Sequence, residues 1–176
     1  DEAVVELKET KFKESTLGLA DKINKIKCSM ETDLELFIPN NYISDVSERL
    51  NLYKRLSQIT TSGGIENFKN ELTNRFGNIP NETIELLKSI SLRSFCEKIN
   101  CEKIILKNNT MILTFNQSSK IKNINENVFK NIINLLQNDT DGKYTIKEKL
   151  DKIKLYVLDI KNINDSIRII KKLAYN

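Results

Sequence analysis

The chain contains 176 residues, 39% of them hydrophobic and 30% charged, and this is the balance of a globular domain that can bury a core of its own. Its 28 basic and 24 acidic residues give a net charge of +4, and the lysines are spread along the chain without the dense basic patch of a dedicated nucleic-acid-binding protein. No apolar run approaches the roughly 20 residues of a membrane span, and the absence of histidine excludes imidazole-based catalysis. We therefore expect a non-enzymatic, cytoplasmic domain.

The first 25 residues differ from the rest of the chain. Apolar side chains at Ala3, Val4 and Leu7 predict the end of a helix, and the mostly polar stretch 8–25 predicts a linker. Because the helical pattern is already under way at Asp1, we expect a fragment of a longer protein. The domain proper is then expected to span residues 26–176.

Residues 28–36 alternate strictly between apolar and polar side chains, and this period of two predicts a half-buried strand. Glu31, Asp33 and Glu35 share the polar face and could in principle hold Mg²⁺. A solvated outer face of a sheet gives the same pattern and is the simpler interpretation.

Residues 42–80 predict two amphipathic helices joined by a Thr-Ser-Gly-Gly turn, and Asp45 can cap the first of them. In each helix the apolar side chains recur every three or four residues: Val46, Leu50, Tyr53 and Leu56 in the first, and Ile65, Phe68, Leu72 and Phe76 in the second. Gly77 stands where a left-handed C-cap belongs, and Pro80 ends the pattern.

The rest of the chain predicts one long helix followed by the order β-β-α-β-β-α. Asn81 can cap the long helix, and the pair Asn108-Asn109 predicts a tight hairpin between strands 103–107 and 110–115. Four further elements complete the order: a helix over 125–136, strands at 143–147 and 153–157, and a helix over 165–174. The fold class is therefore α+β, with helices packed on a small, mainly antiparallel sheet.

The three cysteines do not form an obvious site in the sequence. An odd number without a secretion signal favours a reduced protein, and Cys28 is far from Cys96 and Cys101. A structural zinc site would need four ligands, which three cysteines without histidine do not supply. We therefore expect buried, unreactive thiols, with no metal and no cofactor.

The residue choice in 42–80 resembles that of a known family. Two runs carry the resemblance: Tyr42-Ile43-x-Asp45-x-x-x-Arg49-Leu50-x-x-Tyr53-Lys54-Arg55-Leu56 and Glu71-Leu72-x-x-Arg75-Phe76-Gly77-x-x-Pro80. They are similar to the carboxy-terminal (TRCF) domain of the bacterial transcription-repair coupling factors. The resemblance extends over roughly residues 25–176, and residues 3–8 resemble the end of that family's motor region.

This resemblance implies a domain without catalysis of its own, within an ATP-dependent DNA translocase. In the family, the terminal domain docks on an amino-terminal UvrB-like domain of the same polypeptide. Docking hides the surface that binds UvrA, the damage-recognition subunit, until the motor engages DNA and RNA polymerase. The expected direct partner is therefore the UvrB-like domain, with UvrA and RNA polymerase reached through the full-length protein, no membrane, and no DNA contact by this segment.

The resemblance places the clamp in a Glu-Leu-x-Asp-Arg-Phe-Gly motif, which reads Glu71-Leu72-Thr73-Asn74-Arg75-Phe76-Gly77 in this chain. On a helix that buries Leu72 and Phe76, Glu71 and Arg75 fall on a flank and Asn74 lies nearly opposite. Glu71, Asn74 and Arg75 are thus the candidate partner interface, although Glu71 and Arg75 could instead form an i,i+4 ion pair within the helix. Because Asn74 replaces the family's acid, we expect a weaker or differently paired clamp.

Two other functions stay open on the sequence alone. The domain could guide duplex DNA into the motor through the basic stretch 147–154 and the cations of the last helix, Arg168, Lys171 and Lys172. It could also be a purely structural cap on the motor, in which case the isolated chain would bind nothing.

Overall fold

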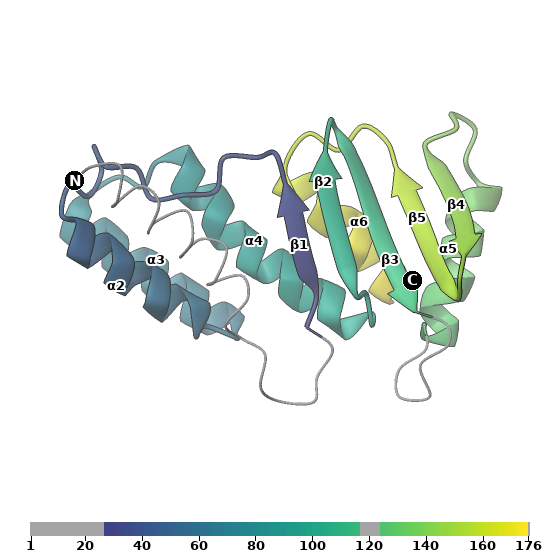
Figure 1. The fold of residues 1–176 in the computed structure, drawn as a ribbon, viewed down its shortest axis with the longest axis horizontal. Helices are drawn as coiled ribbons and strands as arrows, with labels where there is room; N and C mark the ends of the chain where they lie inside the picture. The colour runs from purple at the N-terminus through teal and green to yellow at the C-terminus, as the bar shows by residue number, and fades with distance from the viewer. Residues whose placement is uncertain (1–26, 117–123, 176) are drawn as a thin grey trace. The chain divides into compact units, whose positions relative to one another are not determined.

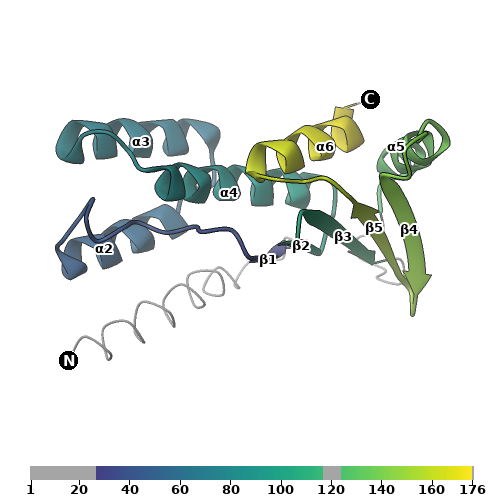
Figure 2. The same ribbon diagram turned by 90° about the horizontal axis from the view of Figure 1, so that it is seen from above.

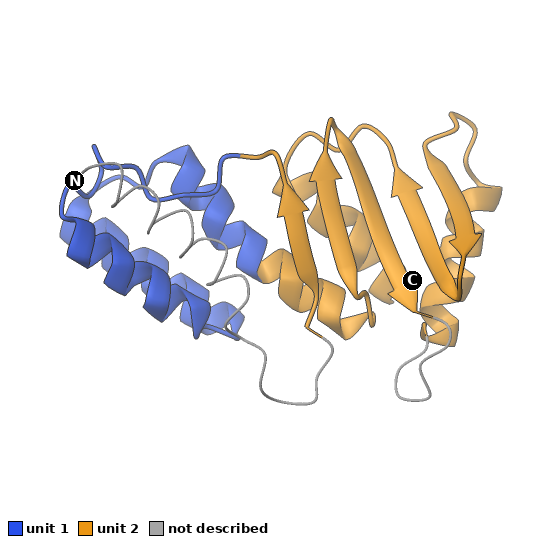
Figure 3. Ribbon diagram, in the orientation of Figure 1, with its two compact units in different colours: residues 1–23, 35–90 blue, residues 24–34, 91–176 orange. Residues whose placement is uncertain are grey.

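The computed structural model describes residues 27–116 and 124–175 (Figures 1 and 2). The helix end and linker predicted within residues 1–25 lie outside these described residues. None of the described helices is long and apolar enough to cross a membrane. The described chain forms two compact units, one of residues 35–90 and the other of residues 27–34, 91–116 and 124–175 (Figure 3).

The first unit is helical and contains α2 (Val46–Ser57), α3 (Ser62–Phe76) and the amino-terminal part of α4 (Asn81–Lys98). The Asp45 carboxylate caps α2 as predicted, since it accepts a hydrogen bond from the Glu48 amide at 2.6 Å. Asn81 is the first residue of α4 and not its cap, because the Ile84 amide already donates to the Pro80 carbonyl at 2.9 Å.

The predicted Thr-Ser-Gly-Gly turn between α2 and α3 is wrong. The Thr61 hydroxyl accepts a hydrogen bond from the Gly64 amide at 3.1 Å, so Thr61 caps α3 and both glycines lie in its first turn. A side chain at Gly64 would bring its Cβ to 2.9 Å from Ile59 Cγ2. The glycine therefore serves close packing against the connection, where the sequence suggested a turn.

One apolar cluster holds the first unit together. Its buried members are Ile38, Ile43, Leu52, Tyr53, Leu56, Phe68, Leu72 and Leu87. The predicted face of α3 is confirmed, but that of α2 is rotated: Leu52 is buried, whereas Val46 and Leu50 are only partly buried. The rotation places Arg49 on the buried side, where its guanidinium donates to the Ile43 carbonyl at 2.6 Å.

Two tyrosines tie the segments of this unit together through their hydroxyl groups. The Ile38 amide donates to the Tyr53 hydroxyl at 2.7 Å. The Tyr42 hydroxyl donates to the Leu72 and Gly77 carbonyls at 3.1 and 3.2 Å, where α3 ends. Gly77 is the C-cap of α3 and has a φ of +82°, as predicted, but its ψ of −151° lies outside the left-handed helical region that the sequence predicted.

The second unit contains a five-stranded sheet with the strand order β1-β2-β3-β5-β4. The strands are β1 (Ser29–Thr32), β2 (Lys103–Lys107), β3 (Thr110–Asn116), β4 (Tyr144–Lys149) and β5 (Lys152–Val157). Only β1 and β2 are parallel among these pairs, so the α+β class with a mainly antiparallel sheet is confirmed. Asn108 and Asn109 have φ of 52° and 55°, which confirms the tight hairpin.

The helices of this unit lie on one side of the sheet (Figure 2). They are the carboxy-terminal part of α4, α5 (Glu126–Gln137) and α6 (Ile163–Tyr175). They cover the alternate strand residues that are buried, among them Ile104, Leu113, Phe115 and Leu155. The opposite side chains of the strands form what we call the open face of the sheet.

Strand β1 is shorter than the predicted strand 28–36. The Leu34 amide donates to the Thr32 hydroxyl at 3.0 Å, and with this local bond the pairing of β1 with β2 ends at Thr32. Of the three acidic residues predicted on its polar face, Glu31 and Asp33 are engaged within the second unit, whereas Glu35 belongs to the first unit. Glu31 forms ion pairs with Lys103 and Lys107, and Asp33 accepts from the Asn108 amide at 2.8 Å.

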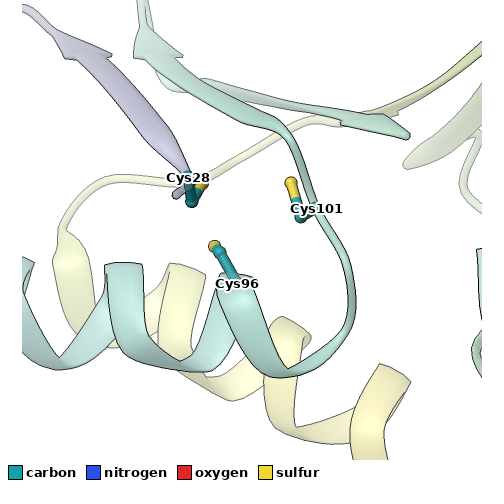
Figure 4. Close-up of side chains that lie close together, drawn as sticks. All are labelled: Cys28, Cys96 and Cys101. Carbon is teal, nitrogen blue, oxygen red and sulfur yellow. The ribbon is translucent and has the colours of Figure 1, made fainter. Parts of the chain in front are cut away.

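The three cysteines are buried, as predicted, but Cys28 is not apart from the other two. The sulfur atoms of Cys28, Cys96 and Cys101 all lie within 4.8 Å of one another (Figure 4). The sequence could not show this, because Cys28 reaches the others through the pairing of β1 with β2.

Candidate functional site

The three predicted interface residues all lie on α3, toward its carboxy-terminal end. Phe68 and Leu72 are buried on the neighbouring face of this helix, nearly opposite Asn74, and hold the helix in the apolar cluster. Glu71 is 30% exposed and Arg75 is 44% exposed, and Asn74 is exposed as well. The helix therefore presents this flank to solvent while its other side is fixed.

Glu71 takes part in a larger arrangement than the predicted i,i+4 pair. Its two carboxylate oxygens accept from the Arg55 guanidinium of α2 at 2.7 and 2.5 Å, in a two-pronged contact. The same carboxylate accepts from Arg75 at 3.0 Å, which is the pair expected within α3. Arg75 in turn contacts the Glu48 carboxylate of α2 at 2.7 Å.

We call Glu48, Arg75, Glu71 and Arg55 the charged ladder, because their charges alternate across the two helices in that order. Two cations and two anions make the ladder neutral as a whole. It cross-links α2 to α3 outside the apolar cluster, and it holds both guanidinium groups in fixed positions.

The guanidinium groups of both arginines lie over aromatic rings. The Arg55 guanidinium carbon lies 5.5 Å from the centre of the Phe68 ring, and that of Arg75 lies 4.7 Å from the centre of the Phe76 ring. Both distances are within the range of a cation–π contact. The rings that anchor α3 in the core thus also orient the cations of the flank.

The ladder changes the electrostatics of Glu71. Hydrogen bonds from Arg55 in the first place, and from Arg75 in the second, lower the pKa of the Glu71 carboxyl to about 2. Glu71 is therefore ionised throughout the physiological range. Its hydrogen bonds also raise the pKa of Arg55, so the pair stays charged.

Asn74 differs from its two neighbours. Its side chain is exposed and hydrogen-bonds to no residue in the described part of the chain. Glu71 and Arg75 are committed to the ladder, whereas the Asn74 amide is available to a partner. The position where the family has an acid is thus the most independent of the three.

Sequence reasoning missed Arg55 and Glu48 as members of this site. Both lie within the first motif run, residues 42–56. Only the packing of α2 on α3 brings them to Glu71 and Arg75. A signal was present, since Glu48 and Arg55 are seven residues apart and thus share one face of α2. Opposite charges at that spacing can meet a complementary pair on a neighbouring helix.

Comparisons with known proteins show the family of the chain. The family model of the TRCF domain matches residues 32–125. The transcription-repair-coupling factor of Rickettsia bellii is 35% identical over 82 residues, which are 47% of this chain and 7% of that protein. The corresponding protein of Borreliella burgdorferi is 30% identical over 125 residues, which are 68% of this chain and 11% of that protein. The chain therefore spans only a small part of the length of these relatives.

The fold is also similar to a solved structure. The crystal structure of the C-terminal domain of a transcription-repair coupling factor superposes with a TM-score of 0.65. The match covers 84% of this chain and 93% of the solved one at 22% sequence identity, so it shows a shared fold.

Proposed function

The chain belongs to the TRCF domain family, and from this premise we propose that it is a non-catalytic regulatory domain of a transcription-repair coupling protein. It docks on the amino-terminal UvrB-like domain of the same polypeptide and masks the surface that binds UvrA. The observation that carries the proposal is the exposed flank of α3, which presents Asn74 beside the preorganised charged ladder.

The ladder suits a docking surface that must open again. Arg55 and Arg75 remain 41% and 44% exposed, and a guanidinium has five donors, so both keep hydrogen-bonding capacity for a partner. Their positions are fixed by Glu71, Phe68 and Phe76, which lowers the entropy lost on docking. The surface is polar, and contacts between exposed charges are weak and screened by salt.

A latch of this kind needs only modest coupling. A regulatory contact that opens when the motor engages can favour the closed state by only a few kcal/mol. We therefore expect docking of the isolated chain to weaken when the salt concentration rises above about 0.1 M, because the Debye length then falls below about 10 Å. Docking that is unchanged or tighter at high salt contradicts a polar latch.

The decisive experiment uses Asn74, because changing it leaves the ladder intact. We would titrate this chain with the amino-terminal domain of its parent protein in a calorimeter, with Asn74→Asp and Asn74→Lys as variants. Asn127→Asp is the matched control, since it adds the same charge on the exposed surface of α5. We expect Asn74→Asp to tighten docking several-fold, because a charged hydrogen bond is about twice as strong as a neutral one.

The other outcomes separate the rival functions. If neither Asn74 variant nor the control changes the docking affinity, the contact lies outside this flank. A folded chain that shows no docking at all overturns the regulatory proposal and favours DNA guidance or a structural cap. Glu71→Ala is a poorer probe than Asn74, because it also leaves Arg55 without its partner.

One observation favours a second candidate function, contact with a nucleic acid. The strand register places Lys103, Lys107, Lys147, Lys149, Lys152 and Lys154 on the open face of the sheet. Lys147 lies directly opposite Lys154, and Lys149 directly opposite Lys152. Like charges in such positions destabilise a sheet, and a bound polyanion would relieve the repulsion.

The structure does not gather all the cations expected for this role. The lysines of 147–154 face away from the helices, whereas Arg168, Lys171 and Lys172 are on α6, which covers the other side of the sheet. Glu31 and Glu102 also neutralise part of the open face through Lys103, Lys107 and Lys152. Lys147→Gln with Lys154→Gln should flatten the salt dependence of DNA binding, whereas Lys171→Gln with Lys172→Gln should not.

A further inference from the structure

The three buried cysteines meet because of two separate features of the backbone. At the end of α4, the Cys101 amide donates to the Cys96 carbonyl at 2.9 Å and the Asn100 amide donates to the Glu97 carbonyl at 3.1 Å. Asn100 has a φ of 58°, so this is a Schellman motif, whose ends commonly touch through their side chains. It brings the sulfur atoms of Cys96 and Cys101 together.

The parallel pairing of β1 with β2 brings Cys28 to the other two cysteines. Ser29 is in register with Lys103, and the Ser29 amide donates to the Glu102 carbonyl at 3.0 Å. Cys28 therefore immediately precedes β1 and lies near Cys101, which is two residues before β2. All three sulfur atoms come within 4.8 Å of one another, and all three side chains have no exposed surface (Figure 4).

We propose that Cys28, Cys96 and Cys101 form a three-coordinate thiolate site for a soft monovalent metal ion, with Cu(I) as the metal that fits best. Three sulfur atoms at about 2.3 Å from a central ion are about 4.0 Å apart, so the cluster needs to contract by less than about 1 Å. Thiolates select soft ions such as Cu(I). Zn²⁺ fits poorly, because among the described residues no fourth cysteine or carboxylate joins the group.

The surroundings favour a negative charge at this point. The cationic side chain of Arg93 lies beside Cys28. Arg93 is held in place by its own contact, since its Nε donates to the Cys28 carbonyl at 3.3 Å.

The protons balance in a defined way. Cu(I) forms three bonds to sulfur as thiolates, and every proton still carried by the three thiols passes to solvent. Binding should therefore release protons, and the affinity should fall as the pH is lowered. The Arg93 charge offsets part of the negative charge of the resulting copper–thiolate group.

The metal would reach its buried site by way of β1. This strand has four residues, stands at the edge of the described sheet and, among the described strands, pairs only with β2, so it can open without disturbing those strands. Once bound, the ion would link β1, β2 and α4 to one another. We therefore expect Cu(I) to protect the amides of β1 from hydrogen exchange.

The test uses the whole chain, kept reduced with a non-thiol reductant under anaerobic conditions, and Cu(I) supplied against a chromophoric chelator. We expect one equivalent of Cu(I) per chain, an ultraviolet thiolate-to-copper band, and slower hydrogen exchange in residues 29–32. Cys28→Ser, Cys96→Ser and Cys101→Ser should each weaken binding at least tenfold. Met30→Leu, which replaces a buried sulfur-containing side chain of β1 with one of similar volume, should still bind one equivalent.

A second measurement protects the test against variants that fail to fold. In the unaltered chain, Cu(I) should slow alkylation of all three thiols at least tenfold. Absence of a stoichiometric Cu(I) complex, or alkylation that Cu(I) does not slow, overturns the proposal. Equal binding of Zn²⁺ at the same thiols overturns the assignment of a soft monovalent ion. None of these outcomes depends on whether the chain docks on a UvrB-like domain.

Discussion

The two units of this chain satisfy their polar groups in different ways. In the first unit, the cations and anions of α2 and α3 are matched one to one in the charged ladder. In the second unit, the open face of the sheet carries six lysines, and two pairs of them lie directly opposite each other on β4 and β5. Electrostatics thus stabilise the helical unit, whereas the opposed lysine pairs of β4 and β5 work against the sheet where Glu31 and Glu102 do not neutralise it.

This difference separates two kinds of surface. A neutral, cross-linked surface holds its side chains in place and suits a specific protein partner whose contacts depend on geometry. An unbalanced basic surface attracts any polyanion and has little geometric selectivity. The comparison therefore favours the α3 flank as the regulatory contact and assigns the open face at most a supporting, less specific role.

The largest effects should come from the two cores, and they test whether the units are separate. Leu72 and Leu155 have no exposed surface, and each belongs to a different unit. Truncation to alanine should lower the free energy of unfolding by about 3 kcal/mol in each case, because it leaves a cavity. Urea unfolding followed by circular dichroism gives the magnitude, and hydrogen exchange shows where it acts.

We expect Leu72→Ala to reduce protection mainly in α2 and α3, and Leu155→Ala mainly in β3 and β5. If either substitution lowers protection equally throughout the described chain, the two units have no separate stability, and the contrast between them is only geometric.

The next effect concerns the ladder and its dependence on pH. The folded-state pKa of Glu71, about 2, lies below its unfolded value, so its contribution is present in full above about pH 4.5. The contribution is lost as the pH falls toward 2, because the unfolded state then gains the proton first. Partial exposure of Glu71 screens the interaction, which we expect to be worth about 1 kcal/mol.

Glu71→Gln should therefore be less stable than the unaltered chain at pH 7, and the difference should shrink between pH 4.5 and 2. Denaturant unfolding at a series of pH values measures it. Glu66→Gln is a suitable control on the same helix, since Glu66 is exposed and makes no ion pair with any described residue. A pH-independent difference for Glu71→Gln would mean that the ladder does not control its ionisation.

Much of the fold could be predicted because it is encoded locally. The apolar spacing of α3, the positive φ of Gly77 and the hairpin at Asn108-Asn109 each depend on a few adjacent residues. The prediction for the two glycines in the first turn of α3 is wrong for the same reason. Gly-Gly favours a turn by itself, and only the capping hydroxyl of Thr61 and the close approach of Ile59 make these residues helical.

The site was only partly predictable, because its contacts join segments that are distant in sequence. The pair Glu71 with Arg75 follows from helical spacing, but the pair Glu71 with Arg55 depends on how α2 rotates against α3. That rotation was set by Leu52 and Arg49, which the expected apolar stripe did not include. Family resemblance supplied the candidate residues, and packing shows which of them is independent of the others.

The smallest effect tests the sheet side of the comparison. Lys154 is exposed and lies opposite Lys147, whose ammonium group rests 4.9 Å from the centre of the Tyr156 ring. Because the two ammonium groups repel each other, Lys154→Gln should raise the free energy of unfolding by about 0.5 kcal/mol at low salt, and the gain should fade as salt is added. Lys172→Gln, on the exposed side of α6, is the control that removes one charge without relieving an opposed pair.

A larger stabilisation by Lys154→Gln than by the control would show that the opposed lysines cost the sheet stability. A bound polyanion could relieve that repulsion. Equal effects of the two substitutions would make the open face an ordinary solvated surface and leave the α3 flank as the stronger candidate.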